Sequence, residues 1–113
     1  MASQIKAIHQ SRAGFFKALG HPTRLFIVEE LARGERCVCE LQEMIDADFS
    51  TVSKHLSLLK SSGVVSDRKE GLKVFYRLRM PCITKFFDCI EEVETMGGKA
   101  KACCSSSRRG SKS

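Results

Sequence analysis

Residues 50–63 read STVSKHLSLLKSSG, and this stretch decides the fold. Val52, Leu56 and Leu59 recur at the spacing of one helix face, so they predict a helix with that face buried. Ser50 is a favourable N-cap and a glycine follows the last periodic position, so we expect the helix to span about residues 50–62. Its other positions carry hydroxyls, one imidazole and one lysine. The stretch therefore predicts a helix that is apolar on one side and polar on the other.

Three more helices are predicted before this stretch. Residues 3–19 carry apolar side chains at helical spacing, and a glycine ends the pattern. A second helix begins at His21-Pro22, because proline is favoured in the first helical turn and the histidine can cap it. This helix is apolar most of the way round, which predicts a central place in the core. A short third helix is expected over residues 37–46, separated by a turn from the helix at residue 50.

After these helices the apolar period changes from 3.6 to 2. The new pattern predicts two strands, residues 64–68 and 74–78, joined by a hairpin loop over residues 69–73. A fifth helix is expected to begin at Pro81 and to end before the glycine pair at residues 97–98. The predicted fold class is therefore mainly α (α+β): a winged helix-turn-helix of five helices, with a β-hairpin wing between helices 4 and 5.

Length and composition limit the possible classes of protein. A chain of 113 residues, 42% of them apolar, suits one domain, and no apolar run approaches the roughly 20 residues of a membrane helix. We expect one winged helix-turn-helix domain over residues 1–98 and a basic, flexible tail containing serine and cysteine over residues 99–113, because the tail has nothing to bury. Since the first residues lack an apolar signal-peptide core, we expect a cytoplasmic protein with reduced cysteines.

Positive charge is concentrated in two segments. Residues 50–79 carry seven basic and two acidic residues, net +5, and residues 99–113 carry five basic and no acidic residues, also net +5. Such segments favour a polyanionic partner. Side chains able to reach phosphates and base edges lie on the fourth helix and the hairpin. The candidate DNA-binding residues are Ser50, Thr51, Ser53, Lys54, His55, Arg68, Lys69 and Lys73. The alternative for any one of them is an ordinary solvated surface position.

Four short motifs together resemble the ArsR/SmtB family of metal-sensing bacterial repressors. They are His21-Pro22-Thr23-Arg24-Leu25, Cys37-Val38-Cys39-Glu40-Leu41, Ser50-Thr51-Val52-Ser53-Lys54-His55-Leu56 and Gly71-Leu72-Lys73-Val74-Phe75-Tyr76. The resemblance covers about residues 5–95. It implies a homodimeric winged helix protein whose first and last helices form the dimer interface, and which binds a palindromic operator in double-stranded DNA until an inducer releases it.

Cys37 and Cys39 are the first candidate inducer ligands. Residues two apart do not face each other on a regular helix, so their sulfurs can converge only if the helix start is unwound. A helix N-terminus also favours thiolates, which suit As(III), Sb(III), Cd(II), Pb(II) or Zn(II). Family members with Cys-Val-Cys here respond to arsenic and antimony or to cadmium and lead. The third cysteine of the arsenic pattern is replaced by Gln42, and residues 1–36 contain no cysteine of the kind that the cadmium pattern uses.

The third sulfur is predicted to come from the tail. Cys103 and Cys104 lie in a polar, basic segment where packing does not explain them. The six residues beyond Gly97 reach about 13 Å as a flexible chain, which allows a three-sulfur site with the first two cysteines, in one subunit or across the dimer. An accessory thiol pair is the alternative. Cys82 stays open as a ligand, whereas Cys89 shares an apolar face and is interpreted as a packing residue.

These patterns predict a transcriptional repressor that binds operator DNA as a homodimer and is released by a thiophilic metalloid, As(III) or Sb(III), held by cysteine thiolates. The alternatives are a repressor responding to Cd(II), Pb(II) or Zn(II), a repressor responding to thiol oxidation, and a constitutive DNA-binding protein. An enzyme is not expected, because the chain has no Cys-x-x-Cys in a βαβ unit and no phosphate-binding glycine loop.

Overall fold

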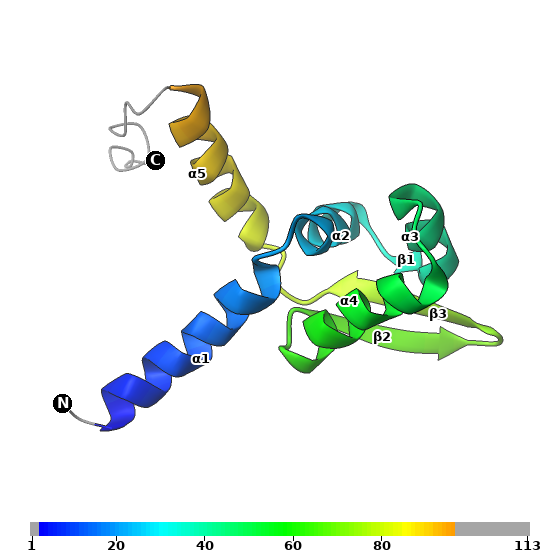
Figure 1. The fold of residues 1–113 in the computed structure, drawn as a ribbon, viewed down its shortest axis with the longest axis horizontal. Coiled ribbons are helices and arrows are strands. Elements are labelled where there is room, and N and C mark those ends of the chain that lie inside the picture. Colours follow the sequence, from blue (N-terminus) through cyan, green and yellow to red (C-terminus); the bar gives the residue numbers. More distant parts are fainter. Residues whose placement is uncertain (1–2, 97–113) are drawn as a thin grey trace. The chain divides into compact units, whose positions relative to one another are not determined.

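The computed structural model describes residues 3–96, which form five helices and a small three-stranded antiparallel sheet (Figure 1). This confirms the predicted fold class. The elements in chain order are α1 (Ser3–Leu19), α2 (Pro22–Arg33), β1 (Arg36–Cys37), α3 (Val38–Ile45), α4 (Phe49–Ser61), β2 (Val65–Glu70), β3 (Lys73–Leu78) and α5 (Ile83–Thr95). The chain divides into two compact units at residue 80, and each is described by itself. The predicted tail, residues 99–113, lies outside the described residues.

The core of the first unit is built from α2, α3, α4 and the sheet. The predicted stripe of α4 is buried, with Val52, Leu56 and Leu59 at most 1% exposed. In α2 only one side is buried, through Ile27, Val28 and Leu31, whereas Leu25 and Phe26 stay more than one-third exposed. One side of α2 thus lies in the core, and α2 is amphipathic in its packing although its sequence is apolar most of the way round.

The sheet has the order β1-β3-β2, and the β2–β3 hairpin is the predicted wing. Its ladder continues to the pair Glu70↔Lys73, so the turn is shorter than the predicted loop of residues 69–73. Gly71 makes this turn possible, because its φ of 64° lies in the left-handed region that side chains disfavour. The short strand β1 was not predicted, since two residues carry no readable period.

The helix starts differ from the prediction at α4. Asp48, and not Ser50, is the N-cap, because its carboxylate accepts a hydrogen bond from the Thr51 N–H at 3.1 Å. The preceding helix ends at Asp46, whose φ of 60° turns the chain away. His21 caps α2 as predicted: its Nδ1 accepts from the Thr23 N–H at 3.1 Å.

Apolar side chains remain exposed on both terminal helices. On α1, Ile5, Ile8 and Phe16 are between 43% and 60% exposed. On α5, which belongs to the second unit, Phe86, Ile90 and Val93 are between 40% and 43% exposed. Exposed apolar faces of this extent indicate contact surfaces. Among the described helices, none combines the length and the apolar character that crossing a membrane requires.

Candidate thiol site and nucleic-acid interface

The sulfurs of Cys37 and Cys39 lie 2.6 Å apart. Cys37 stands outside the helix: its backbone is extended, with φ −83° and ψ 161°, and it pairs with Phe75 of β3. Cys39 follows in the first turn of α3. The two sulfurs were predicted to converge only if the start of the helix is unwound. This is what the structure shows, because Cys37 belongs to β1 and α3 begins at Val38, whereas a helix over residues 37–46 was predicted. The two thiols converge because β1 holds the first of them.

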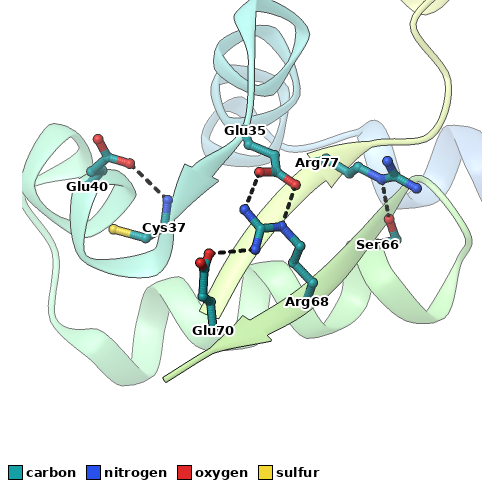
Figure 2. Close-up of polar contacts among 7 residues, drawn as sticks. All are labelled: Glu35, Cys37, Glu40, Ser66, Arg68, Glu70 and Arg77. Carbon is teal, nitrogen blue, oxygen red and sulfur yellow. Dashed lines mark hydrogen bonds and ion pairs between the residues drawn. The ribbon is translucent and has the colours of Figure 1, made fainter. Parts of the chain in front are cut away.

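Neighbouring groups set the ionisation of this pair. The Glu40 carboxylate accepts a hydrogen bond from the Cys37 N–H at 2.9 Å (Figure 2), and this bond holds the pKa of Glu40 below its usual range. The hydrogen bond with the Cys37 thiol, together with desolvation, raises the pKa of the Cys39 thiol. The helix N-terminus was expected to lower the pKa of the thiol, but the hydrogen bond and the desolvation together raise it. A metal ion that binds both sulfurs as thiolates must displace the thiol protons.

Both cysteines line a surface pocket of about 230 Å³, here called the dithiol pocket. Its walls come from α3, from the first residue of α4 and from the turn and second strand of the wing. The other lining residues are Val38, Gln42, Phe49, Leu72, Lys73 and Val74. Gln42, the residue at the position of the missing third cysteine, thus lies beside the sulfurs. The pocket brings the thiols together with both elements that were predicted to contact DNA.

A complete metal site is not present among residues 3–96: no three His, Cys, Asp or Glu side chains there are placed to hold one ion. Cys103 and Cys104, the predicted further ligands, lie outside the described residues. Cys82 is an exposed free thiol directly before α5. Cys89 on α5 is half-buried, and its thiol is not free. Within residues 3–96, Cys37 and Cys39 are the two sulfurs that the structure brings into contact.

The polar side of α4 carries the other predicted site residues. Ser50, Thr51 and Lys54 are exposed, and Ser53 is half-buried. His55 packs toward α2: its ring centre lies 4.6 Å from that of His21, and its Nδ1 lies 3.4 Å from Nη1 of Arg24. Burial, and then the positive neighbours, lower the pKa of His55. The structure thus places His55 between the helix face and the core.

Arg68 of the wing is held by two carboxylates (Figure 2). Its Nε and Nη2 donate to the Glu35 oxygens at 3.0 and 2.9 Å, and Nη1 donates to Glu70 at 2.7 Å. The guanidinium carbon also lies 4.7 Å from the Phe75 ring centre. These contacts raise the pKa of Arg68 and hold that of Glu35 below its usual range. Sequence reasoning missed Glu35, because no local pattern connects two residues 33 positions apart.

Lys69 and Lys73 are the exposed lysines of the wing, and within residues 3–96 neither makes an ion pair. A separate ion pair, Lys60 with Asp67 at 3.0 Å, connects α4 to β2. Between β3 and β2, the Arg77 Nε donates to the Ser66 hydroxyl at 3.3 Å (Figure 2). Arg68 is therefore neutralised within the wing, whereas Lys69 and Lys73 are available to a polyanion.

Comparisons with known proteins identify the family. The family model for bacterial regulatory proteins of the arsR family matches residues 21–67. A helix-turn-helix-type transcriptional regulator of Methanocaldococcus jannaschii is 36% identical over 86 residues, which cover 75% of this chain and 97% of that one. The chain belongs to the ArsR family. This ArsR-family protein is accordingly a transcriptional regulator and not an enzyme, as predicted.

Other relatives of this ArsR-family protein differ in the metal that their names give. The cadmium resistance transcriptional regulatory protein CadC of Listeria innocua is 44% identical over 70 residues, covering 61% of this chain and 59% of its own. The arsenical resistance operon repressor of Escherichia coli is 48% identical over 64 residues, covering 56% of this chain and 55% of its own. The chain thus spans a little over half the length of these two relatives.

A solved structure supports the fold of this ArsR-family protein. The homodimeric winged helix-turn-helix DNA-binding domain from Mycobacterium bovis, a possible ArsR-family regulator, is 30% identical with a TM-score of 0.74. The similarity covers 86% of this chain and 90% of that one. This similarity to a homodimeric DNA-binding domain confirms the predicted winged helix-turn-helix fold.

Proposed function

We propose that this ArsR-family regulator is a homodimeric repressor that As(III) or Sb(III) releases from operator DNA. Cys37 and Cys39 bind the metalloid, and a tail thiol, Cys103 or Cys104, supplies the third sulfur. The observation that carries the proposal is the pair of sulfurs 2.6 Å apart in a pocket that also contains the first residue of α4 and the wing turn. Ligation there acts on both elements proposed to contact DNA.

The proposed DNA contacts come from α4 and the wing. Ser50, Thr51 and Lys54 are exposed and reach phosphates or base edges, and Ser53 and His55 contribute from half-buried positions. Lys69 and Lys73 contact the phosphate backbone. Arg68, predicted as a further contact, is assigned here to holding the wing, because Glu35 and Glu70 already neutralise it. The two recognition helices of the dimer then enter half-sites about 34 Å apart.

The proposed dimer buries the exposed apolar faces of α1 and α5. Each face carries three large side chains that water would otherwise cover. The homodimeric relative from Mycobacterium bovis supports this assignment. As a regulator of transcription, the protein is proposed to act in the cytoplasm.

Cd(II) is the second candidate inducer, because the cadmium resistance regulator is 44% identical over 70 residues. Cd(II), Pb(II) and Zn(II) favour a site with four ligands, of which the described residues supply two. Oxidation of the paired thiols is a third candidate, favoured by the same 2.6 Å separation of the sulfurs.

Operator release by the reduced, full-length protein tests these candidates. As(III), Sb(III), Cd(II), Pb(II) and Zn(II) are titrated in turn against the protein–operator complex, followed by hydrogen peroxide without metal. We expect As(III) and Sb(III) to act at the lowest concentrations. Release only by the divalent ions would transfer the assignment to cadmium-type sensing, and reversible release by peroxide alone would transfer it to thiol oxidation. A complex that resists every addition would contradict the inducer site itself.

A further inference from the structure

Phe49 is the first residue of α4, and it is 59% exposed. It does not belong to the buried stripe of this helix, which begins at Val52. It lines the dithiol pocket, but most of its side chain faces solvent. A large apolar side chain left open on a surface that is proposed to bind DNA indicates contact with an apolar group of that partner.

The residues beside Phe49 at the start of α4 are smaller and polar. The cap residue Asp48 accepts hydrogen bonds from the Ser50 hydroxyl at 3.3 Å and from the Thr51 N–H at 3.1 Å. Its carboxylate therefore occupies the position in which a helix N-terminus would bind a phosphate. The phenyl ring is the largest side chain of this first turn, and the turn is better suited to base edges than to the DNA backbone.

A phenyl ring cannot distinguish bases by their amino and carbonyl groups, but it can contact an apolar group. The apolar group that a base edge displays in the major groove is the 5-methyl group of thymine. The N-terminal residues of a recognition helix are those that contact base edges in this groove. We infer that Phe49 contacts the 5-methyl group of a thymine in the operator and thereby determines sequence preference. This inference rests on the proposed function, because it takes α4 as the recognition helix.

This contact is chemically distinct from the other proposed DNA contacts. The thymine methyl group is displayed in the major groove and not in the minor groove. Lys69 and Lys73 are proposed to act on phosphates, and such contacts weaken as the salt concentration rises. A contact between two apolar groups releases no counterions, and burying one methyl group changes affinity about fourfold. The methyl contact therefore has a definite size and no salt dependence.

The test uses the reduced, full-length protein and the duplex that it selects from a pool of random DNA sequences. Each thymine of that duplex is replaced in turn by deoxyuridine, which pairs in the same way and lacks the 5-methyl group. Fluorescence anisotropy measures the affinity of the unmodified protein and of the variants Phe49→Ala and Phe49→Leu. Leu58→Ala is the matched control, because Leu58 is also exposed on α4, by 40%, but lies near the other end of the helix.

In each half-site we expect a thymine at which uracil weakens binding by the unmodified protein about fourfold. Phe49→Ala should bind the thymine duplex more weakly by a similar factor and should no longer distinguish thymine from uracil at that position. Phe49→Leu should keep part of the discrimination, because leucine also presents apolar surface. Leu58→Ala should keep all of it. The slope of log affinity against log salt should be the same in all four proteins.

An equal loss of affinity for thymine and uracil duplexes in Phe49→Ala would overturn the inference, because Phe49 would then support the fold of α4 and not read the methyl group. An unmodified protein that is indifferent to uracil at every position would also overturn it. So would discrimination that Phe49→Ala keeps and Leu72→Ala loses, since the exposed leucine of the wing turn would then read the methyl group.

In each of these three cases the protein still binds a selected duplex, so the proposed function survives and only the role of Phe49 is rejected. If no sequence is enriched from the random pool, sequence-specific DNA binding is absent and both proposals fail together.

Discussion

Helices α3 and α4 begin in the same way and present different chemistry. The residue before each helix is extended, with φ −83° and ψ 161° at Cys37 and φ −74° and ψ 163° at Asp48. At α3 the cap side chain is a thiol that meets a second thiol two residues onward. At α4 the cap is a carboxylate that binds a backbone N–H of its own helix. The comparison teaches that the same backbone arrangement can bring two thiols together or cap its own helix, depending on the side chain at the cap position.

The difference has an electrostatic consequence for DNA binding. A free helix N-terminus attracts phosphates, but at α4 the carboxylate of Asp48 already occupies it. Its pKa lies below the usual range because the Thr51 side chain and backbone, and then Ser50, donate hydrogen bonds to it. The attraction for phosphate must therefore come from side chains such as Lys54 and from the wing. Mutations at the start of α3 should therefore change the response to the proposed inducer, and mutations at the start of α4 should change operator binding, each without the other.

The largest expected effect follows from Cys37→Ser or Cys39→Ser. Either change removes one of the two sulfurs, so the As(III) concentration needed for operator release should rise about 100-fold or more. Operator affinity without inducer should stay within about twofold, because neither side chain belongs to the start of α4. A fluorescence-anisotropy titration of labelled operator measures both quantities.

Cys82→Ser is the matched control, since Cys82 is another exposed, free thiol. Its response to As(III) should equal that of the unmodified protein. A comparable loss in the control would mean that thiol content in general, and not the dithiol pocket, governs release.

The next largest effect concerns the cations of α4 and the wing. Lys54→Gln and Lys69→Gln should each weaken operator binding about tenfold at low salt, and lower the slope of log affinity against log salt by about 1 per subunit. Arg68→Gln should leave the slope nearly unchanged, because Glu35 and Glu70 neutralise this guanidinium. Inducer binding should persist in all three. A slope change for Arg68→Gln as large as that for Lys69→Gln would show that Arg68 leaves its carboxylates for a phosphate.

Periodic features of the fold could be predicted from the sequence, and contacts between distant segments could not. Residues 3–19 were predicted as a helix and are observed as Ser3–Leu19, because helical spacing of apolar side chains is a local signal. The buried stripe of α4 follows the same rule. By contrast, β1 forms only because Cys37 pairs with Phe75, far along the chain. The same separation hid the Arg68–Glu35 contact.

The candidate site likewise has features that the sequence predicts and features that only the fold reveals. Cys37 and Cys39 were found from spacing and residue type, and so was the condition for their convergence. The pocket around them was not found, since Phe49 and Leu72 belong to elements that only the fold brings beside the thiols. The cap of α4 was misplaced because Asp48 and Ser50 are both good N-caps in sequence. The hydrogen bond that the Asp48 carboxylate accepts from the Thr51 N–H identifies Asp48 as the cap.

A smaller effect is expected at the cap of α4. Asp48→Asn keeps an oxygen for the Thr51 N–H and removes a negative charge, so operator affinity should rise about threefold, with a smaller loss of stability than in Asp48→Ala. Asp48→Ala loses the cap, and its thermal midpoint should fall by several degrees. Because the carboxylate pKa is lower in the folded state than its ordinary 3.8, the charged cap contributes at neutral pH and is lost below about pH 4. An unchanged thermal midpoint in Asp48→Ala would contradict the capping role.

The smallest expected effect is a pH dependence of stability that comes from His55 of α4. Burial, His21 and Arg24 lower its pKa below the ordinary 6.5, so the unfolded chain binds a proton more readily than the folded chain. Stability should therefore fall as the pH drops through 6.5 toward the folded value, by on the order of 0.3 M in the urea midpoint between pH 7.5 and 5.5. His55→Gln should lose this dependence, and His9→Gln, a change at an exposed position on α1, should retain it. If His55→Gln keeps the full pH dependence of stability, the His55 ring is not the group whose protonation destabilises the fold. The ring would then be as available for contact with DNA as the side chain of Lys54.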